Sequence, residues 1–197
     1  DVNYEKYKIN APLIVDNTGI WTDRNNLERH LSSGAKKVLL TAPAGGDIPN
    51  IVYGVNHHQI TTKHHLISAA SCTTNAIVPV LKVLVDKYGV EHGHVETVHA
   101  YTNDQNLIDN YHPGDRRGRS AALNMVLTST GAARAVSKVI PELKGKLTGN
   151  AIRVPTPNVS MAILNLQLSQ NVTRDGLNEF LRYMALHSKY QQQIGYT

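Results

Sequence analysis

The stretch His65–Gly89, HLISAASCTTNAIVPVLKVLVDKYG, contains the two neighbouring elements that decide how this chain folds. Its first residues, His65–Ala69, are β-prone and predict a short strand. Ser71 then precedes a run in which apolar residues recur at helical spacing as far as Tyr88-Gly89, so a helix is predicted with Ser71 as its N-cap. The single cysteine of the chain, Cys72, is therefore expected in the first turn of that helix.

Short apolar runs and turns alternate in the segment before this stretch. Asn17-Thr18-Gly19 is predicted as a turn and Thr22–Leu31 as a helix, because Leu27 and Leu31 recur at i and i+4. Strands that alternate with a helix favour a mostly parallel sheet of βαβ type. The strand candidates here are Pro12–Asp16, Lys37–Thr41 and Ile51–Val55.

The residues after the long helix have a different pattern. Val95–Tyr101 is β-prone and places His99 near the end of a strand. Thr102–Ser120 is rich in Asn, Asp, Arg, Gly and Pro, and it predicts a long loop of functional importance. Gly131–Ile140 and Thr173–Leu186 are predicted as helices, the second with Thr173 as its N-cap.

Two further β-prone runs, Ala151–Val154 and Val159–Leu168, are predicted to form an antiparallel pair. The expected fold class is therefore α/β. The predicted organisation is the tail of a parallel-sheet domain over residues 1–71, followed by an α+β domain with a mostly antiparallel sheet over residues 72–197.

The composition fits a globular protein. Hydrophobic residues make up 41% and charged residues 18% of the 197 residues, a balance typical of packed proteins rather than disordered ones. The apolar runs are far shorter than the ~20 residues that cross a bilayer. The first residues lack the pattern of a secretory signal, and a single cysteine excludes an internal disulfide, which fits a reducing cytoplasm.

The formal net charge is +5 and the pI is near 9.3, which favours anionic ligands. Arg116, Arg117 and Arg119 form the densest basic cluster. A nucleic acid, a small phosphate ester and a merely solvated basic surface all remain open at this point. The cluster lacks the interleaved aromatic residues of a single-strand-binding platform.

Cys72 has either a structural or a chemical role. An isolated cysteine is most often a buried packing residue. At a helix start, however, unpaired backbone N–H groups and the positive end of the helix dipole stabilise a thiolate. The same N–H groups can bind an oxyanion that forms on a carbonyl attacked by sulfur.

A reactive thiol needs a base, and histidine is the side chain that exchanges a proton near neutral pH. The chain has ten histidines. Zinc binding by the paired histidines is an alternative, but one cysteine and no His-Glu-x-x-His spacing disfavour it, so no metal site is predicted. His99 is the better base candidate, because a strand terminus presents its side chain in a fixed direction.

Five segments carry a family resemblance. They are, in order, Ser68–Asn75 (SAASCTTN), Thr97–Asp104 (TVHAYTND), Ser129–Ala133 (STGAA), Val139–Gly149 (VIPELKGKLTG) and Arg153–Ser160 (RVPTPNVS). Together they resemble the phosphorylating glyceraldehyde-3-phosphate dehydrogenases, in the order of that family and over nearly the whole chain. The resemblance implies a Rossmann-type domain before the catalytic domain, a cytoplasmic location and a homotetramer in which the loop Thr102–Ser120 crosses a neighbouring subunit.

The resemblance also implies a glycolytic reaction. Cys72 attacks the aldehyde of glyceraldehyde 3-phosphate, His99 accepts the proton, and hydride passes to NAD, with NADP not excluded. Inorganic phosphate then releases the thioester as 1,3-bisphosphoglycerate. The residues implied to bind the phosphate groups are Ser71, Thr73, Thr102, Arg117, Thr130, Gly131 and Arg153, and those implied to face the dinucleotide are Thr18, Gly19 and Thr41. Arginine suits phosphate because its planar fork donates two hydrogen bonds.

The chain departs from the family pattern in three places. No Gly-rich dinucleotide motif precedes Asp1, and the chain stops at Thr197, ahead of a nicotinamide-contacting Asn, so a fragment is expected. Ala76 occupies a position where many relatives have a second cysteine. Two rival functions are kept: an erythrose-4-phosphate dehydrogenase with the same Cys and His, and a secondary RNA-binding role of the arginine cluster.

Overall fold

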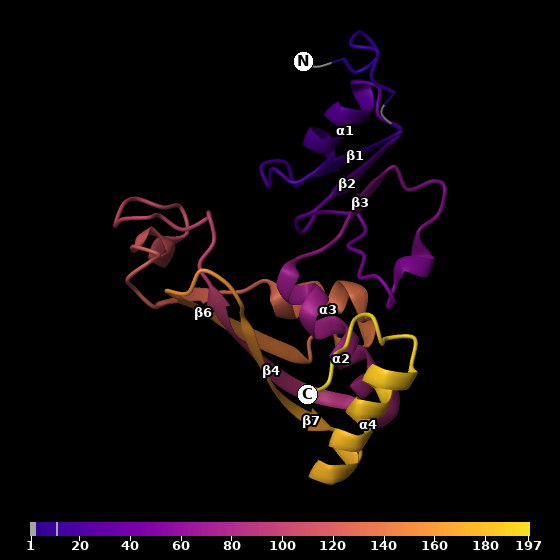
Figure 1. The fold of residues 1–197 in the computed structure, drawn as a ribbon, viewed down its shortest axis with the longest axis vertical. Coiled ribbons are helices and arrows are strands. Elements are labelled where there is room, and N and C mark those ends of the chain that lie inside the picture. Colours follow the sequence, from indigo (N-terminus) through magenta and orange to yellow (C-terminus); the bar gives the residue numbers. More distant parts are fainter. Residues whose placement is uncertain (1–2, 11) are drawn as a thin grey trace. The chain divides into compact units, whose positions relative to one another are not determined.

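The computed structural model describes residues 3–10 and 12–197, which form two compact units (Figure 1). The first unit contains the described residues up to Val83, together with Lys138–Ile140 and Val172–Thr197. The second unit contains Leu84–Ser137 and Pro141–Asn171.

The first unit is built on a small parallel sheet. Its strands β1 (Leu13–Asp16), β2 (Lys37–Leu40) and β3 (Leu66–Ser68) lie in that order, and both strand pairs are parallel. Helix α1 (Arg24–Ser32) connects β1 to β2 and packs against β2 and β3. The predicted parallel βαβ arrangement is therefore confirmed.

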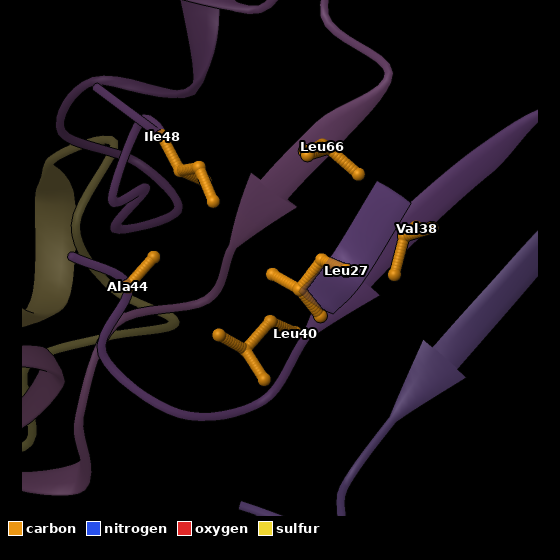
Figure 2. Close-up of a cluster of buried hydrophobic side chains, with 6 residues drawn as sticks. All are labelled: Leu27, Val38, Leu40, Ala44, Ile48 and Leu66. Atoms are coloured by element: carbon orange, nitrogen blue, oxygen red, sulfur yellow. The ribbon is translucent and has the colours of Figure 1, made fainter. Parts of the chain in front are cut away.

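A compact apolar cluster holds α1 against the sheet. Figure 2 shows Leu27 of α1 facing Val38 and Leu40 of β2, with Leu66 of β3 beside them. Leu27 and Leu40 have no solvent-exposed surface. Burying such side chains contributes about 1.5–3 kcal/mol each, which explains why Leu27 of the predicted helical stripe is buried.

One predicted strand is wrong. Ile51–Val55 forms turns, because the backbone N–H groups of Val55 and Asn56 both donate to the carbonyl of Val52 at 3.1 Å. A 3-10 turn, η1 (His57–Gln59), follows. The Asn56 side chain accepts from the N–H of Val52 at 2.7 Å, so these backbone groups are satisfied within the loop rather than by a sheet partner.

Two helices start where the sequence predicts. Helix α2 (Cys72–Tyr88) is preceded by Ser71, whose hydroxyl accepts from the N–H of Thr74 at 3.0 Å. Helix α4 (Arg174–His187) is capped by Thr173, whose hydroxyl accepts from Gly176 N at 3.2 Å. Both contacts are the side-chain caps expected of Ser and Thr at helix starts.

The second unit contains a mixed four-stranded sheet. Its strands are β4 (Val90–Ala100), β5 (Val126–Ser129), β6 (Leu147–Val154) and β7 (Met161–Leu168), in the order β5-β6-β4-β7. The β5–β6 and β4–β7 pairs are antiparallel and the β6–β4 pair is parallel. The mostly antiparallel sheet is therefore confirmed.

The details of this sheet differ from the prediction. β6 and β7 are not paired with each other, because β4 lies between them. β4 begins at Val90, and β5 was not predicted at all. Helix α3 (Ala132–Val139) agrees with its prediction, and short 3-10 turns, η2 (Asp115–Gly118) and η3 (Pro141–Leu143), lie in the loops. Across the described part of the chain, no helix is both long and apolar enough to cross a membrane.

Candidate active site

Cys72 is exposed at the first position of α2, between two hydroxyl side chains. The Ser71 hydroxyl lies 2.7 Å from the Thr74 hydroxyl and also caps the helix. Thr73 Oγ1 lies 4.0 Å from Cys72 Sγ. The predicted trio Ser71, Cys72 and Thr73 therefore shares one helical turn, where backbone N–H groups favour a negatively charged atom.

The backbone just before Cys72 has an unusual conformation. Ala70 has φ +59°, a left-handed conformation that L side chains rarely adopt. The Asn75 side-chain amide, in the first turn of α2, donates to the carbonyls of Ala69 and Ser71 at 2.8 and 2.9 Å. These two hydrogen bonds hold the turn before Cys72 against the start of the helix.

The residues predicted to face a dinucleotide lie at one edge of the parallel sheet. Thr18 and Gly19 follow β1, and Thr41 follows β2 with its N–H donating to Asp16 O at 2.9 Å. Gly19 has φ +70° and open space where a Cβ would stand. Because β3 ends at Ser68, Cys72 follows the same carboxyl edge, which is where open parallel sheets bind ligands.

Asp16 organises the turn after β1. Its buried carboxylate accepts from the Thr18 N–H at 2.9 Å and the Thr18 hydroxyl at 2.7 Å, and it lies 3.1 Å from Nε2 of His30. Burial works to raise the pKa of Asp16, but the hydrogen bonds from Thr18 and His30 outweigh it and hold that pKa below its ordinary value. The turn that contains Thr18 and Gly19 therefore depends on an ionised Asp16.

In the second unit, His99 and Arg153 are neighbours. His99 is the penultimate residue of β4 and is in register with Arg153 of β6 on the adjacent parallel strand. One guanidinium nitrogen of Arg153, Nη1, lies 2.8 Å from His99 Nδ1 and donates to the Ala100 carbonyl at 3.0 Å. A predicted base and a predicted phosphate ligand are thus brought together by parallel strand pairing.

Nδ1 of His99 has two close polar neighbours. It lies 2.6 Å from the Ala100 carbonyl oxygen, which can only accept a hydrogen bond, and 2.8 Å from Arg153 Nη1, which can only donate one. The two contacts therefore favour opposite tautomers of the His99 imidazole.

Arg117 lies in a second basic location. Its Nε donates to the Thr128 hydroxyl of β5 at 3.3 Å, and its Nη1 donates to the Asp104 carboxylate. Arg116 and Arg117 line a cavity of about 340 Å³, whereas Arg119 is paired with Asp109 at 3.3 Å.

Thr130 and Gly131 precede α3, further along the sheet. The Thr130 hydroxyl accepts from Ala132 N at 3.1 Å, and Gly131 is exposed with open space around it. They follow Ser129, which is in register with Asn150, whereas Arg153 is in register with Val126. Thr130 and Arg153 therefore lie near opposite ends of the β5–β6 pairing. Thr102 is exposed just after β4.

Two contacting residues were missed by the sequence analysis. Asp104 engages Arg117 although the two are separated by an irregular loop. The Ser160 hydroxyl accepts from the N–H of Ala100 at 3.2 Å, beside His99. Neither residue had a periodic or spacing signal, because both contacts join segments that only the tertiary fold brings together.

Most of the chain matches a known protein family. Residues 71–197 match the family model described as the glyceraldehyde 3-phosphate dehydrogenase, C-terminal domain. The chain belongs to the glyceraldehyde 3-phosphate dehydrogenase family. The family match begins at Ser71 and so includes Cys72, His99, Arg117 and Arg153.

Individual family members are similar over most of this chain. A glyceraldehyde-3-phosphate dehydrogenase-like protein of Pseudomonas aeruginosa (strain UCBPP-PA14) is 62% identical over 100% of the chain, which covers 43% of that relative. A glyceraldehyde-3-phosphate dehydrogenase of Zymomonas mobilis is 45% identical over 99% of the chain and 58% of its own length. Glyceraldehyde-3-phosphate dehydrogenase 1 of Bacillus subtilis is 50% identical over 90% of the chain and 53% of its own length. The chain thus spans about half the length of these family members.

Within the described residues, no group of three or more His, Cys, Asp or Glu side chains is placed to hold a metal ion. Cys72 belongs to the first unit, and His99, Arg117 and Arg153 belong to the second.

Proposed function

We propose that this chain carries the catalytic residues of a phosphorylating glyceraldehyde-3-phosphate dehydrogenase, an oxidoreductase of glycolysis. The observation that carries the proposal is the exposed thiol of Cys72 in the first turn of α2, at the carboxyl edge of the parallel sheet. A thiol in that environment is suited to nucleophilic attack on an aldehyde, because it is exposed and the helix N–H groups can stabilise the charge that forms on the carbonyl oxygen.

The enzyme is proposed to be a cytoplasmic homotetramer. In this proposal residues 1–71 are the C-terminal part of a Rossmann-type NAD-binding domain and residues 72–197 the catalytic domain. The open turn at Gly19 and the exposed Thr18 and Thr41 fit a nicotinamide dinucleotide, because they lie after β1 and β2 where such ligands bind. NAD, or NADP in its place, supplies a hydride acceptor when bound.

The reaction begins at sulfur. The Cys72 thiolate attacks the aldehyde carbon of glyceraldehyde 3-phosphate, and a carbon–sulfur bond forms. His99 first takes the thiol proton of Cys72 and returns it to the oxyanion, which the N–H groups of the first turn of α2 help to stabilise. His99 then takes the hydroxyl proton of the hemithioacetal as hydride leaves the same carbon for the bound dinucleotide, and a thioester remains on Cys72.

Inorganic phosphate completes the reaction. A phosphate oxygen attacks the thioester carbonyl, the carbon–sulfur bond breaks, and Cys72 leaves as the thiolate while 1,3-bisphosphoglycerate forms. Arg153 and Thr130 lie near opposite ends of the β5–β6 pairing, which supports two anion subsites. Thr102, Arg117 and Arg153 are proposed to hold the substrate phosphate. The residues proposed for inorganic phosphate are Ser71, Thr73, Thr130 and Gly131.

The test is detection of the acyl-enzyme by mass spectrometry of the intact protein after mixing with glyceraldehyde 3-phosphate and NAD without inorganic phosphate. The wild-type protein is expected to gain the mass of the acyl group, and Cys72→Ser is expected to gain none while still binding NAD. His99→Asn is expected to form the same adduct about 10²–10⁴-fold more slowly, the usual contribution of a general base. An acyl-enzyme in Cys72→Ser would refute the assignment.

The names of the relatives support the three-carbon substrate over erythrose 4-phosphate. Turnover of the two aldehydes by the same protein distinguishes them. A strong preference for the four-carbon sugar would overturn the proposed substrate. RNA binding that is unaffected by NAD and persists when Arg117 is replaced would indicate that the basic cluster is a separate RNA-binding surface.

A further inference from the structure

The turn that delivers Cys72 to α2 requires support. Ala70 is 3% exposed and has φ +59°. An alanine in this left-handed conformation is less stable than one in the β region, so the turn persists only where neighbouring contacts enforce it. If Ala70 relaxed, Ser71 would lose its position as the cap of α2, and Cys72 would leave the first helical turn.

Ser68 provides that support from the end of β3. Its side chain is completely buried, and its hydroxyl accepts from the N–H of Ala70 at 3.0 Å. The same oxygen lies 2.7 Å from the Ala42 carbonyl and 3.0 Å from Asn50 Oδ1, either of which can take its proton. The Ser68 hydroxyl therefore bonds directly to the backbone of Ala70, two residues further along the chain, and so favours the conformation that Ala70 adopts.

Asn50 in turn fixes the surroundings of Ser68. It is 8% exposed, and its amide binds both polar groups of one residue: Oδ1 accepts from Ala44 N at 3.0 Å and Nδ2 donates to Ala44 O at 3.2 Å. Nδ2 also lies 3.2 Å from the Ile48 carbonyl. A buried amide with donor and acceptor both satisfied has one orientation, so Oδ1 is held facing the Ser68 hydroxyl.

We propose that Ser68 and Asn50 are positioning residues for Cys72: they hold Ala70 in its left-handed conformation and thereby keep the thiol among the first N–H groups of α2. The inference rests on the proposed function only in that Cys72 is taken as the nucleophile. Neither Ser68 nor Asn50 is proposed to touch the substrate. Their effect reaches the sulfur through the backbone of Ala70 and Ser71.

The test uses alkylation of Cys72 by iodoacetamide, followed by mass spectrometry at neutral pH. The thiolate attacks the methylene carbon, the carbon–sulfur bond forms and iodide leaves. Because the chain has one cysteine, the rate reports this thiol alone. Ser68→Ala and Asn50→Ala are each expected to lower the rate by up to about tenfold, the factor that one ordinary hydrogen bond is worth.

A rescue variant separates positioning from general loosening. Adding Ala70→Gly to Ser68→Ala is expected to restore most of the rate, because glycine adopts φ +59° without the alanine penalty. Were Ser68 important only for folding, the added glycine would give no rescue. The matched control is Thr173→Ala, which loses one side-chain to backbone bond at the start of α4 without touching Ser68 or Asn50, and its rate is expected to stay within twofold of wild type.

A wild-type rate in Ser68→Ala, or a double variant no faster than Ser68→Ala, would overturn the inference. These outcomes are independent of the dehydrogenase assignment, because alkylation needs no cofactor or aldehyde. The acyl-enzyme experiment with Cys72→Ser tests that assignment separately.

Discussion

Replacement of Arg153 by lysine tests the substrate-phosphate subsite beside His99. Lysine keeps the positive charge but loses the planar fork, so it cannot donate to the Ala100 carbonyl and to a phosphate with the same geometry. A hydrogen bond to a charged group is worth about 1.5–3 kcal/mol. Loss of one such bond corresponds to a fall of about 10- to 150-fold in kcat/KM for glyceraldehyde 3-phosphate.

The assay compares two substrates that differ only in the phosphate. Steady-state kcat/KM is measured for glyceraldehyde 3-phosphate and for unphosphorylated glyceraldehyde, and only the first is expected to fall by the full factor. The control is Arg174→Lys, at a residue whose side chain is 89% exposed and lies outside the predicted site. An equal loss with both substrates would refute the phosphate role, because it would show that Arg153 acts only by orienting His99.

Three further predictions concern stability, each measured by urea unfolding monitored by far-UV circular dichroism. Leu27→Ala, at a side chain with no exposed surface, is expected to cost about 2–5 kcal/mol because it leaves a cavity in the cluster of Figure 2; a loss below about 1 kcal/mol would mean that α1 repacks. Asp16 has a lowered pKa, so its stabilisation is present above the ordinary value near ~3.9 and is lost as pH falls through the lower folded value. Asp16→Asn should therefore show a shallower loss of stability than wild type on acidification, and parallel pH profiles would contradict this. Thr173→Ala is expected to cost about 1 kcal/mol through loss of the α4 cap, whereas Thr173→Ser should be nearly neutral.

Local features of this fold could be predicted from the sequence. The starts of α2 and α4 depend on hydroxyl groups that bond to an N–H three residues away, so Ser71 and Thr173 could be identified as caps without tertiary information. Two of the three predicted strands before His65, and the strand that includes Leu66, form the parallel sheet. Cys72 and His99 were singled out as a thiol at a helix start and an imidazole at a strand end.

Contacts between distant segments were decided by tertiary structure alone. Nothing local in Ala151–Val154 indicates that its neighbour is β4 rather than the strand that follows it, because strand pairing depends on long-range burial of both partners. The same pairing places Arg153 against His99, and the loop places Asp104 against Arg117. Ile51–Val55 has the composition of a strand, yet the Asn56 side chain accepts from the N–H of Val52 and donates to the carbonyl of Asn50, which holds this segment in turns. The sequence by itself therefore determined where α2 and α4 begin, and it predicted Cys72 and His99 as the reactive side chains. Only the tertiary structure decided their neighbours, because hydrogen-bond partners and burial are supplied by residues far away in the chain.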